Sequence, residues 1–105
     1  MIQRGDIRWL RFSKPLKRRP VLILGLPKLL PSLNQIPVIP FSTRVRGLPW
    51  EVSLSPADGL PSACVLKPEW IRSVERYELE HLIATFPDDR WHEVRRALLF
   101  VLGLD

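Results

Sequence analysis

Arg18-Arg19-Pro20-Val21-Leu22-Ile23-Leu24 places two cations directly before an apolar run that continues to residue 26. A nearly unbroken apolar run of this length predicts a strand that is buried on both faces. Pro20 fixes its own φ angle and favours an extended backbone at the residue before it, so we expect Arg19 at the mouth of this strand. A guanidinium there is charged at any working pH and can bind two phosphate oxygens at once. The alternative is a solvated run of charge on a loop.

A second apolar stretch, residues 35–43, predicts another strand that ends in two hydroxyl side chains, Ser42 and Thr43. Pro37 and Pro40 remove two backbone donors from it, which implies an edge strand, a bulge or a break. Hydroxyls at a strand end often bond only the local backbone. These two gain interest because arginines follow at once, so that one short loop offers hydroxyls and cations together.

The charge is divided unevenly along the chain. Residues 1–50 contain ten Lys and Arg but one acid, whereas residues 51–105 contain six Lys and Arg and ten acids. The formal net charge of +5 therefore combines +9 in the first half with −4 in the second. Basic loops beside buried strands favour a rigid scaffold that presents positive charge to a polyanion. We interpret the basic half as the polyanion-facing side and the acidic half largely as solvated scaffold.

The rest of the chain predicts a small, mainly β domain that ends in a helix. Short strands are expected at residues 7–12, 50–54, 63–66 and 70–74. In the tail, apolar residues recur at helical spacing over residues 91–102, with Asp88 and Asp89 at the expected start and Gly103 at the end. These elements predict a single domain over residues 1–105, a small barrel or curled sheet with a helix packed on it.

Composition excludes several classes of protein. A chain of 105 residues with 46% hydrophobic and 26% charged residues suits one folded domain rather than a disordered segment. No apolar run approaches the roughly 20 residues of a membrane span, and no signal peptide is recognisable, so we expect a soluble cytoplasmic protein. The single cysteine, Cys64, lies in an apolar run and is expected to be buried. His81 and His92 are expected on the surface, and no metal-ligand spacing is present.

Four further residues complete the candidate site. Lys67 and Glu69 flank Pro68 and point to the same side if the backbone is extended, with Arg72 close behind. A carboxylate beside a cation can act as a base, or the two can form a surface ion pair worth less than about 1 kcal/mol, which is the more frequent case. Tryptophans are more often core than binding surface, and Trp50, on an alternating strand after the basic loop, is the best candidate for stacking on a base.

Taken in order, these motifs resemble the MazF/PemK (Kid) toxins of toxin–antitoxin pairs. The opening Arg4-Gly5-Asp6-Ile7-x-Trp9 is similar to that family's R-G-D/E-I-W, and residues 18–24 to its x-R-P-V-L-V-I strand. Residues 38–43 and 47–52 are similar to its V-V-P-I/V-T-S segment and its P-x-E-V strand. Residues 70–74 stand where members carry Q-I-R-T-V/I, and residues 94–104 are similar to the terminal helix. The resemblance covers nearly the whole chain in unbroken order.

The resemblance implies an SH3-like small barrel of the MazF/CcdB type, working as a homodimer. It implies an endoribonuclease that cuts single-stranded RNA without a metal or other cofactor. It also implies a cognate antitoxin with an acidic, partly disordered tail. The family's catalytic arginine and threonine fall on Arg19 and Ser42, and Glu69 is a candidate base. RNA contacts are expected from Lys17, Arg18, Thr43, Arg44, Arg46, Trp50, Lys67 and Arg72.

The chain departs from the family before the R-P step, where members carry a longer loop rich in Gly, Glu and Gln and this chain has only residues 13–17. Two other functions therefore stay open. One is a catalytically weak or inactive member that binds RNA or an antitoxin, and the other is a gyrase-poison-like toxin of the same fold family. A structural, ribosome-associated barrel would fit the basic charge but not the placement of the R-P and P-F-S-T motifs.

Overall fold

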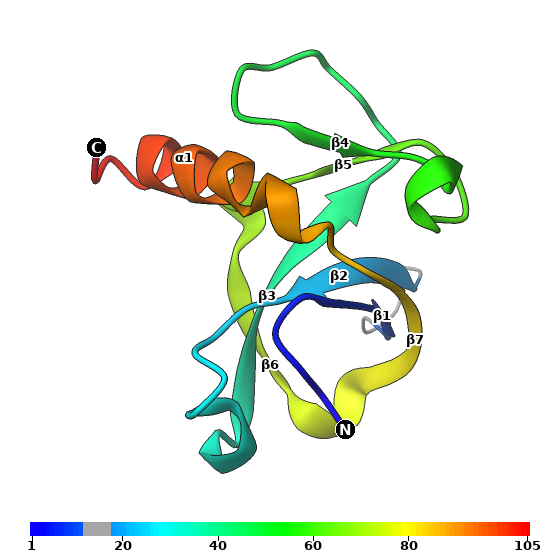
Figure 1. Cartoon of the computed structure of the whole chain (residues 1–105), viewed down its shortest axis with the longest axis vertical. Coiled ribbons are helices and arrows are strands. Elements are labelled where there is room, and N and C mark those ends of the chain that lie inside the picture. The colour runs from blue at the N-terminus through cyan, green and yellow to red at the C-terminus, as the bar shows by residue number, and fades with distance from the viewer. Residues whose placement is uncertain (12–17) are drawn as a thin grey trace.

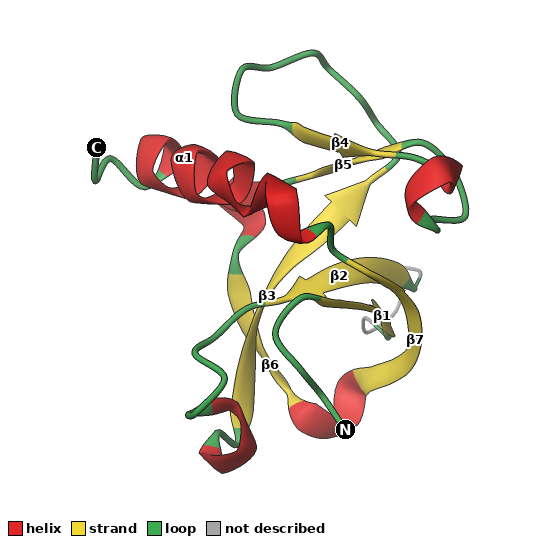
Figure 2. Ribbon diagram, viewed as in Figure 1, coloured by secondary structure: helices red, strands yellow, loops and turns green. Residues whose placement is uncertain are grey.

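The computed structural model describes residues 1–11 and 18–105. Within them seven strands form one antiparallel sheet, and an α-helix, α1 (Trp91–Val101), follows the last strand (Figures 1 and 2). The strands are β1 (Asp6–Leu10), β2 (Arg19–Ile23), β3 (Gln35–Ser42), β4 (Val52–Leu54), β5 (Cys64–Leu66), β6 (Arg72–Glu75) and β7 (Leu79–Thr85). Short 3-10 turns join them: η1 (Leu30–Ser32), η2 (Pro56–Asp58), η3 (Pro68–Trp70), η4 (Arg76–Glu78) and η5 (Asp88–Arg90). None of the described helices is long and apolar enough to cross a membrane.

The strands follow the order β4-β5-β3-β2-β1-β7, and β6 pairs with β3 beside this path. Figure 1 shows the sheet curling, with α1 lying across one side of it near β4 and β5. The helix packs onto the sheet through Val94 and Ala97, which are buried among residues from β1 to β5. The predicted mainly β fold with a curled sheet and a C-terminal helix is confirmed.

Strands β2 and β3 are buried on both faces, as the apolar run at residues 20–26 predicts. On one face, Leu22 and Ile39 belong to the core cluster that α1 covers. On the other face, Val21, Ile23 and Val38 belong to a second cluster. All five side chains are completely buried. Strand β2 ends at Ile23, earlier than the apolar run predicts, because Gly25 adopts a φ angle of 116° and turns the chain away.

The two prolines of β3 do not make it an edge strand, because β3 pairs with β2, β5 and β6. Its partner on one side changes from β6, whose first residue Arg72 lies opposite Val38, to β5, whose last residue Leu66 lies opposite Phe41. The Pro40 carbonyl accepts a hydrogen bond from the Lys67 N–H on that side (2.9 Å). The missing N–H of Pro40 therefore lies where the sheet changes partner. The strand itself continues from Gln35 to Ser42, so the predictions of an edge and of a break in it are both wrong.

The C-terminal helix ends as the sequence predicts. Gly103 has a φ angle of 70° and donates to the Phe100 carbonyl (3.1 Å), while Leu104 donates to the Leu99 carbonyl (2.8 Å). This pattern is a Schellman motif, which satisfies the last carbonyls of the helix. The predicted apolar stripe is too wide, however, because Leu102 is 48% exposed.

Two differences from the predicted elements concern the second half of the chain. The sequence analysis does not predict β7, whose pairing with β1 is interrupted by two register shifts. Those irregularities remove the alternation by which a half-exposed strand is recognised. The strand predicted at residues 70–74 begins at Arg72, because Pro68–Trp70 form a 3-10 turn. Of the strand predicted at residues 7–12, residue 12 lies outside the described residues.

Replacing Phe86 by alanine should lower the free energy of unfolding by about 3–5 kcal/mol. Its ring is 1% exposed and lies 4.9 Å from the ring of Trp91, so its loss leaves a cavity between the sheet and α1. Urea denaturation followed by circular dichroism measures the change. The control is Tyr77→Ala, which removes a ring that is 84% exposed and should change stability by no more than about 0.5 kcal/mol. Equal losses in both variants would contradict this description of the core.

Candidate functional site

A groove of about 780 Å³ opens where β2 begins and where β3 and β5 end. The register that pairs Val21 with Pro40, continued by two residues, sets Arg19 opposite Ser42. Residues directly opposite in an antiparallel pair share one face of the sheet. The groove unites most of the predicted site: it is lined by Arg18, Arg19, Ser42, Thr43, Arg44, Arg46, Lys67 and Glu69, together with Trp9 and Trp70.

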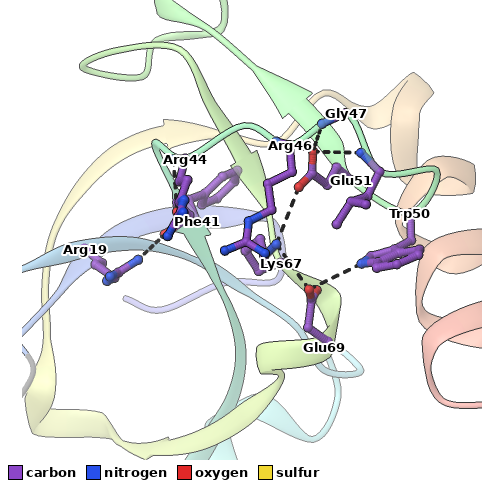
Figure 3. A network of polar contacts seen from close by, with 11 residues as sticks. Arg19, Phe41, Arg44, Arg46, Gly47, Trp50, Glu51, Lys67 and Glu69 are labelled. Carbon is purple, nitrogen blue, oxygen red and sulfur yellow. Dashed lines mark hydrogen bonds and ion pairs between the residues drawn. The ribbon is translucent and has the colours of Figure 1, made fainter.

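Arg19 is half-buried at the first position of β2, as Pro20 predicts. One of its N–H groups donates to the Phe41 carbonyl (3.4 Å; Figure 3). Its guanidinium carbon lies 5.2 Å from the centre of the Trp70 ring. A guanidinium has five N–H donors in a planar fork. The strand and one weak hydrogen bond thus orient Arg19 toward the groove, where its other N–H groups can donate to a ligand.

Ser42 ends β3 with its side chain buried beside the groove. Its hydroxyl oxygen accepts a hydrogen bond from the Arg44 N–H (3.1 Å). The local backbone bond that is common for strand-end hydroxyls is therefore present. Because that bond uses a lone pair, the O–H of Ser42 keeps its capacity to donate. Thr43, Arg44 and Arg46 follow as exposed residues at the rim of the groove.

Lys67 is the buried cation of the groove, with 5% of its surface exposed. Its ammonium lies between two carboxylates, 3.4 Å from Glu51 and 3.2 Å from Glu69 (Figure 3). The interpretation of Lys67 and Glu69 as a surface ion pair is wrong, because the ammonium is removed from solvent. Their backbone is not extended either, since Lys67 precedes the η3 turn. A buried ammonium needs such carboxylates to offset its desolvation.

Glu51 is the site residue that the sequence analysis misses. Its side chain is 3% exposed, and one carboxylate oxygen accepts bonds from the N–H groups of Arg46 (3.2 Å), Gly47 (2.9 Å) and Leu48 (3.3 Å). Burial by itself raises the pKa of Glu51, but these bonds and the bond from Lys67 outweigh it, so the pKa lies below its usual value. Glu51 is therefore an anion that ties the basic loop to the floor of the groove.

Glu69 lies at the edge of the groove and accepts a bond from the indole N–H of Trp50 (3.3 Å). Burial by itself raises the pKa of Glu69. Its own backbone N–H and its bonds to Lys67 and Trp50 outweigh this effect, so the pKa lies below its usual value and Glu69 is ionised at neutral pH. The Trp50 ring packs against the core and stacks on Phe100 at 5.8 Å. It does not line the groove, so the structure places the predicted stacking residue outside the site.

The remaining predicted residues are more peripheral. Arg18 lines the groove but is ion-paired with Glu80 (2.8 Å) and lies over the ring of Trp9 at 4.7 Å. Arg72 is exposed on β6 and is not among the residues that line the groove. Lys17 lies outside the described residues.

Two further expectations, on Cys64 and on the histidines, are confirmed. Cys64 is buried, and this burial, together with the charge of Asp58, raises its pKa to about 11. His81 and His92 are exposed. Nowhere in residues 1–11 and 18–105 do three His, Cys, Asp or Glu side chains gather as they would around a metal ion.

Comparisons of the sequence and of the structure with known proteins match this chain to the same family. The family model described as PemK-like, MazF-like toxin of type II toxin–antitoxin system matches residues 3–102. The chain is 30% identical over 96 residues to the probable endoribonuclease MazF5 of Mycobacterium tuberculosis, an alignment that covers 90% of this chain and 87% of that protein.

Two solved structures are similar over almost their whole length. The Mycobacterium tuberculosis toxin MazF-mt6 has a TM-score of 0.86 at 27% identity, covering 95% of this chain and 98% of that one. A MazE–MazF structure from Deinococcus radiodurans has a TM-score of 0.82 at 29% identity, covering 99% and 98%. With the family model spanning nearly all residues and the fold and groove in agreement, this chain belongs to the PemK-like, MazF-like toxins of type II toxin–antitoxin systems.

Proposed function

We propose that this toxin is an endoribonuclease that cleaves single-stranded RNA in the groove between β2, β3 and β5. The observation that carries the proposal is the placement of Arg19 opposite Ser42, beside the Lys67–Glu69 pair, in one open groove. The name of the related MazF5 supports an endoribonuclease. Single strands are the preferred substrate because bases must be unstacked to enter such a groove.

The reaction is attack of a ribose 2′-OH on the adjacent phosphorus. The bond from phosphorus to the 5′ oxygen breaks, and the leaving oxygen takes a proton from water in the open groove, which yields a 2′,3′-cyclic phosphate and a free 5′-OH. Negative charge gathers on the phosphorane oxygens, and the Arg19 guanidinium stabilises it as a fixed cation in a partly dry site. A guanidinium holds its protons firmly at neutral pH and is a poor proton donor, so the role of Arg19 is electrostatic. Ser42 orients a phosphate oxygen through its free O–H.

Glu69 is the proposed acceptor of the 2′-OH proton. A base must be ionised, and the bonds from Lys67 and Trp50 that lower the pKa of Glu69 keep it so at neutral pH. The same low pKa makes it a weaker base, so proton transfer to Glu69 occurs late, when the hydroxyl has become acidic through its bond to phosphorus. Lys67 lies between Glu69 and Glu51 and fixes the position of the carboxylate.

The partners follow from the charge of the surface around the groove. Arg18, Arg44 and Arg46 are exposed at its rim, where they bind flanking phosphates of the RNA. A cognate antitoxin with an acidic, partly disordered tail would cover the same basic surface. The MazE–MazF structure from Deinococcus radiodurans supports a protein partner for this toxin. RNA and an antitoxin both occur in the cytoplasm, so the toxin acts there.

The proposed working state is a homodimer. The C-terminal part of the chain leaves large apolar side chains exposed: Phe100 by 52%, Leu102 by 48% and Leu104 by 69%. Contiguous exposed apolar residues of this kind are typical of a surface that a second subunit covers. Their position at the end of α1, away from Arg19, leaves the groove open in each subunit.

An RNA oligonucleotide that contains the cleavage sequence should be cut in excess chelator and should release a 2′,3′-cyclic phosphate. A first digest of total RNA, mapped by sequencing the new ends, identifies that sequence. Replacing the attacking 2′-OH by hydrogen at the cut removes the nucleophile, so cleavage there should stop. Cleavage that persists with the 2′-deoxy substrate would rule out this mechanism.

Arg19→Ala should lower the cleavage rate at least tenfold, since loss of one transition-state donor typically costs about 100-fold or more. Arg19→Lys should restore only part of the rate, because an ammonium lacks the bidentate fork. Single-turnover cleavage of the mapped oligonucleotide measures both. Arg95→Ala, which removes an exposed arginine of α1 outside the groove, is the matched control and should leave the rate unchanged. An unaltered rate in Arg19→Ala would reject the assigned role.

Glu51→Gln should lower the free energy of unfolding at neutral pH by about 1–3 kcal/mol, because a buried charge that accepts three backbone bonds is lost. The lowered pKa of Glu51 sets the sign of its pH dependence. A carboxyl group with a lowered pKa stabilises the fold above its usual pKa of 4.5, and this contribution disappears as the pH falls through the lowered value. The wild type should therefore lose more stability on acidification than the variant.

Chemical denaturation at a series of pH values measures this difference. Asp105→Asn, at the exposed C-terminal residue, is the control and should follow the wild-type curve. Parallel curves for wild type and Glu51→Gln would show that Glu51 does not hold the loop as described.

A further inference from the structure

Trp70 is a large apolar side chain that lies outside both core clusters. It is 41% exposed and lines the groove. Trp50 and Trp91 pack against the main core, whereas Trp70 belongs to neither cluster of buried residues in the described parts of the chain. The two core clusters therefore do not account for an indole at this position. An aromatic ring that faces a groove with convergent polar groups is typical of a ligand-binding site.

The backbone holds Trp70 rigidly although its ring is exposed. Trp70 is the last residue of η3, and its N–H donates to the Lys67 carbonyl (2.8 Å). The next residue, Ile71, donates to the carbonyl of Pro68 (3.2 Å) and packs against the core. A ring on such a turn loses little conformational freedom when a ligand binds.

Two cations lie over this ring, both farther from its centre than Arg18 is from the centre of the Trp9 ring. The Arg19 guanidinium carbon is 5.2 Å and the Lys67 ammonium 5.5 Å from its centre. A nucleotide whose base rests on the indole therefore brings its phosphate close to the Arg19 donors. Trp9, the other tryptophan of the groove, is engaged differently. Arg18 lies over its ring at 4.7 Å and is itself held by an ion pair with Glu80 (2.8 Å).

We propose that Trp70 is a stacking platform for one unpaired base of the RNA, next to the phosphate that Arg19 stabilises. This site rests on the proposed endoribonuclease function and adds to it a residue that sets the register of the RNA strand in the groove. Every base has a π face, so stacking is tolerant of sequence and contributes affinity rather than base choice. The flat ring and the neighbouring cations together fit a nucleotide, which carries both an aromatic base and a negative charge.

The test uses the mapped RNA oligonucleotide with a 2′-deoxy residue at the cut, labelled with fluorescein and titrated with the full-length protein. Fluorescence anisotropy gives its Kd. Trp70→Ala should raise the Kd on the order of tenfold, as is typical for the loss of one base–aromatic stack, and Trp70→Phe should stay close to wild type. Tyr77→Ala, which removes a highly exposed ring outside the groove, should leave the Kd unchanged. Thermal unfolding checks that each variant is folded.

A set of oligonucleotides with one abasic position each then locates the stacked base. One position should weaken wild-type binding by about the same factor as Trp70→Ala, and in the Trp70→Ala protein that abasic site should cause no further loss. Additive losses at every position would show that the ring does not contact a base.

The cleavage constants separate this role from a purely supportive one. A stacking platform raises KM with little change in kcat. A fall in kcat with an unchanged Kd would mean that Trp70 acts only by positioning Arg19, and it would overturn the proposal, as would a Trp70→Ala protein that binds RNA like the wild type. If the wild-type protein binds no RNA at all, the proposed function fails together with this site.

Discussion

The pairing of β2 with β3 is the constraint on which the site depends. Both strands are buried on both faces, so their register cannot slip without moving a core residue such as Leu22 or Ile39 into the wrong cluster. That fixed register carries Arg19 to a position opposite Ser42, at the point where both strands leave the sheet. The packing of these two apolar strands thereby fixes the positions of a cation and a hydroxyl beside an open groove.

The acidic half of the chain has a larger part in the site than its charge pattern implies. From the sequence we expect the carboxylates of this half to be largely solvated. In the structure, Glu80 pairs with Arg11 and Arg18, while Glu51 and Glu69 enclose the ammonium of Lys67. The ion pairs of Glu80 thus join the two halves, and the carboxylates of the acidic half restrain cations of the groove without neutralising Arg19.

The sequence predicts this site where local chemistry is decisive and fails where tertiary structure overrides it. Pro20 and the apolar run after it are local signals, and they place Arg19 correctly. Glu51 is missed because alternation with Val52 assigns it to the solvent side, and only the loop folding over it buries its carboxylate. Trp50 is favoured over Trp70 as the stacking residue because no pattern in the sequence shows that Phe100 of α1 covers the Trp50 ring. Strand β7 is missed because its pairing with β1 is irregular.

The way in which Glu51 holds the basic loop has a consequence for how this toxin can diversify. Its carboxylate contacts backbone N–H groups of residues 46 to 48 and none of their side chains. The loop therefore keeps its shape whatever side chain replaces Arg46 or Leu48, while Gly47, with a φ angle of 71°, is the position where a side chain would strain the backbone. Single substitutions can therefore change the side chains at the rim of the groove without moving the residues beneath it.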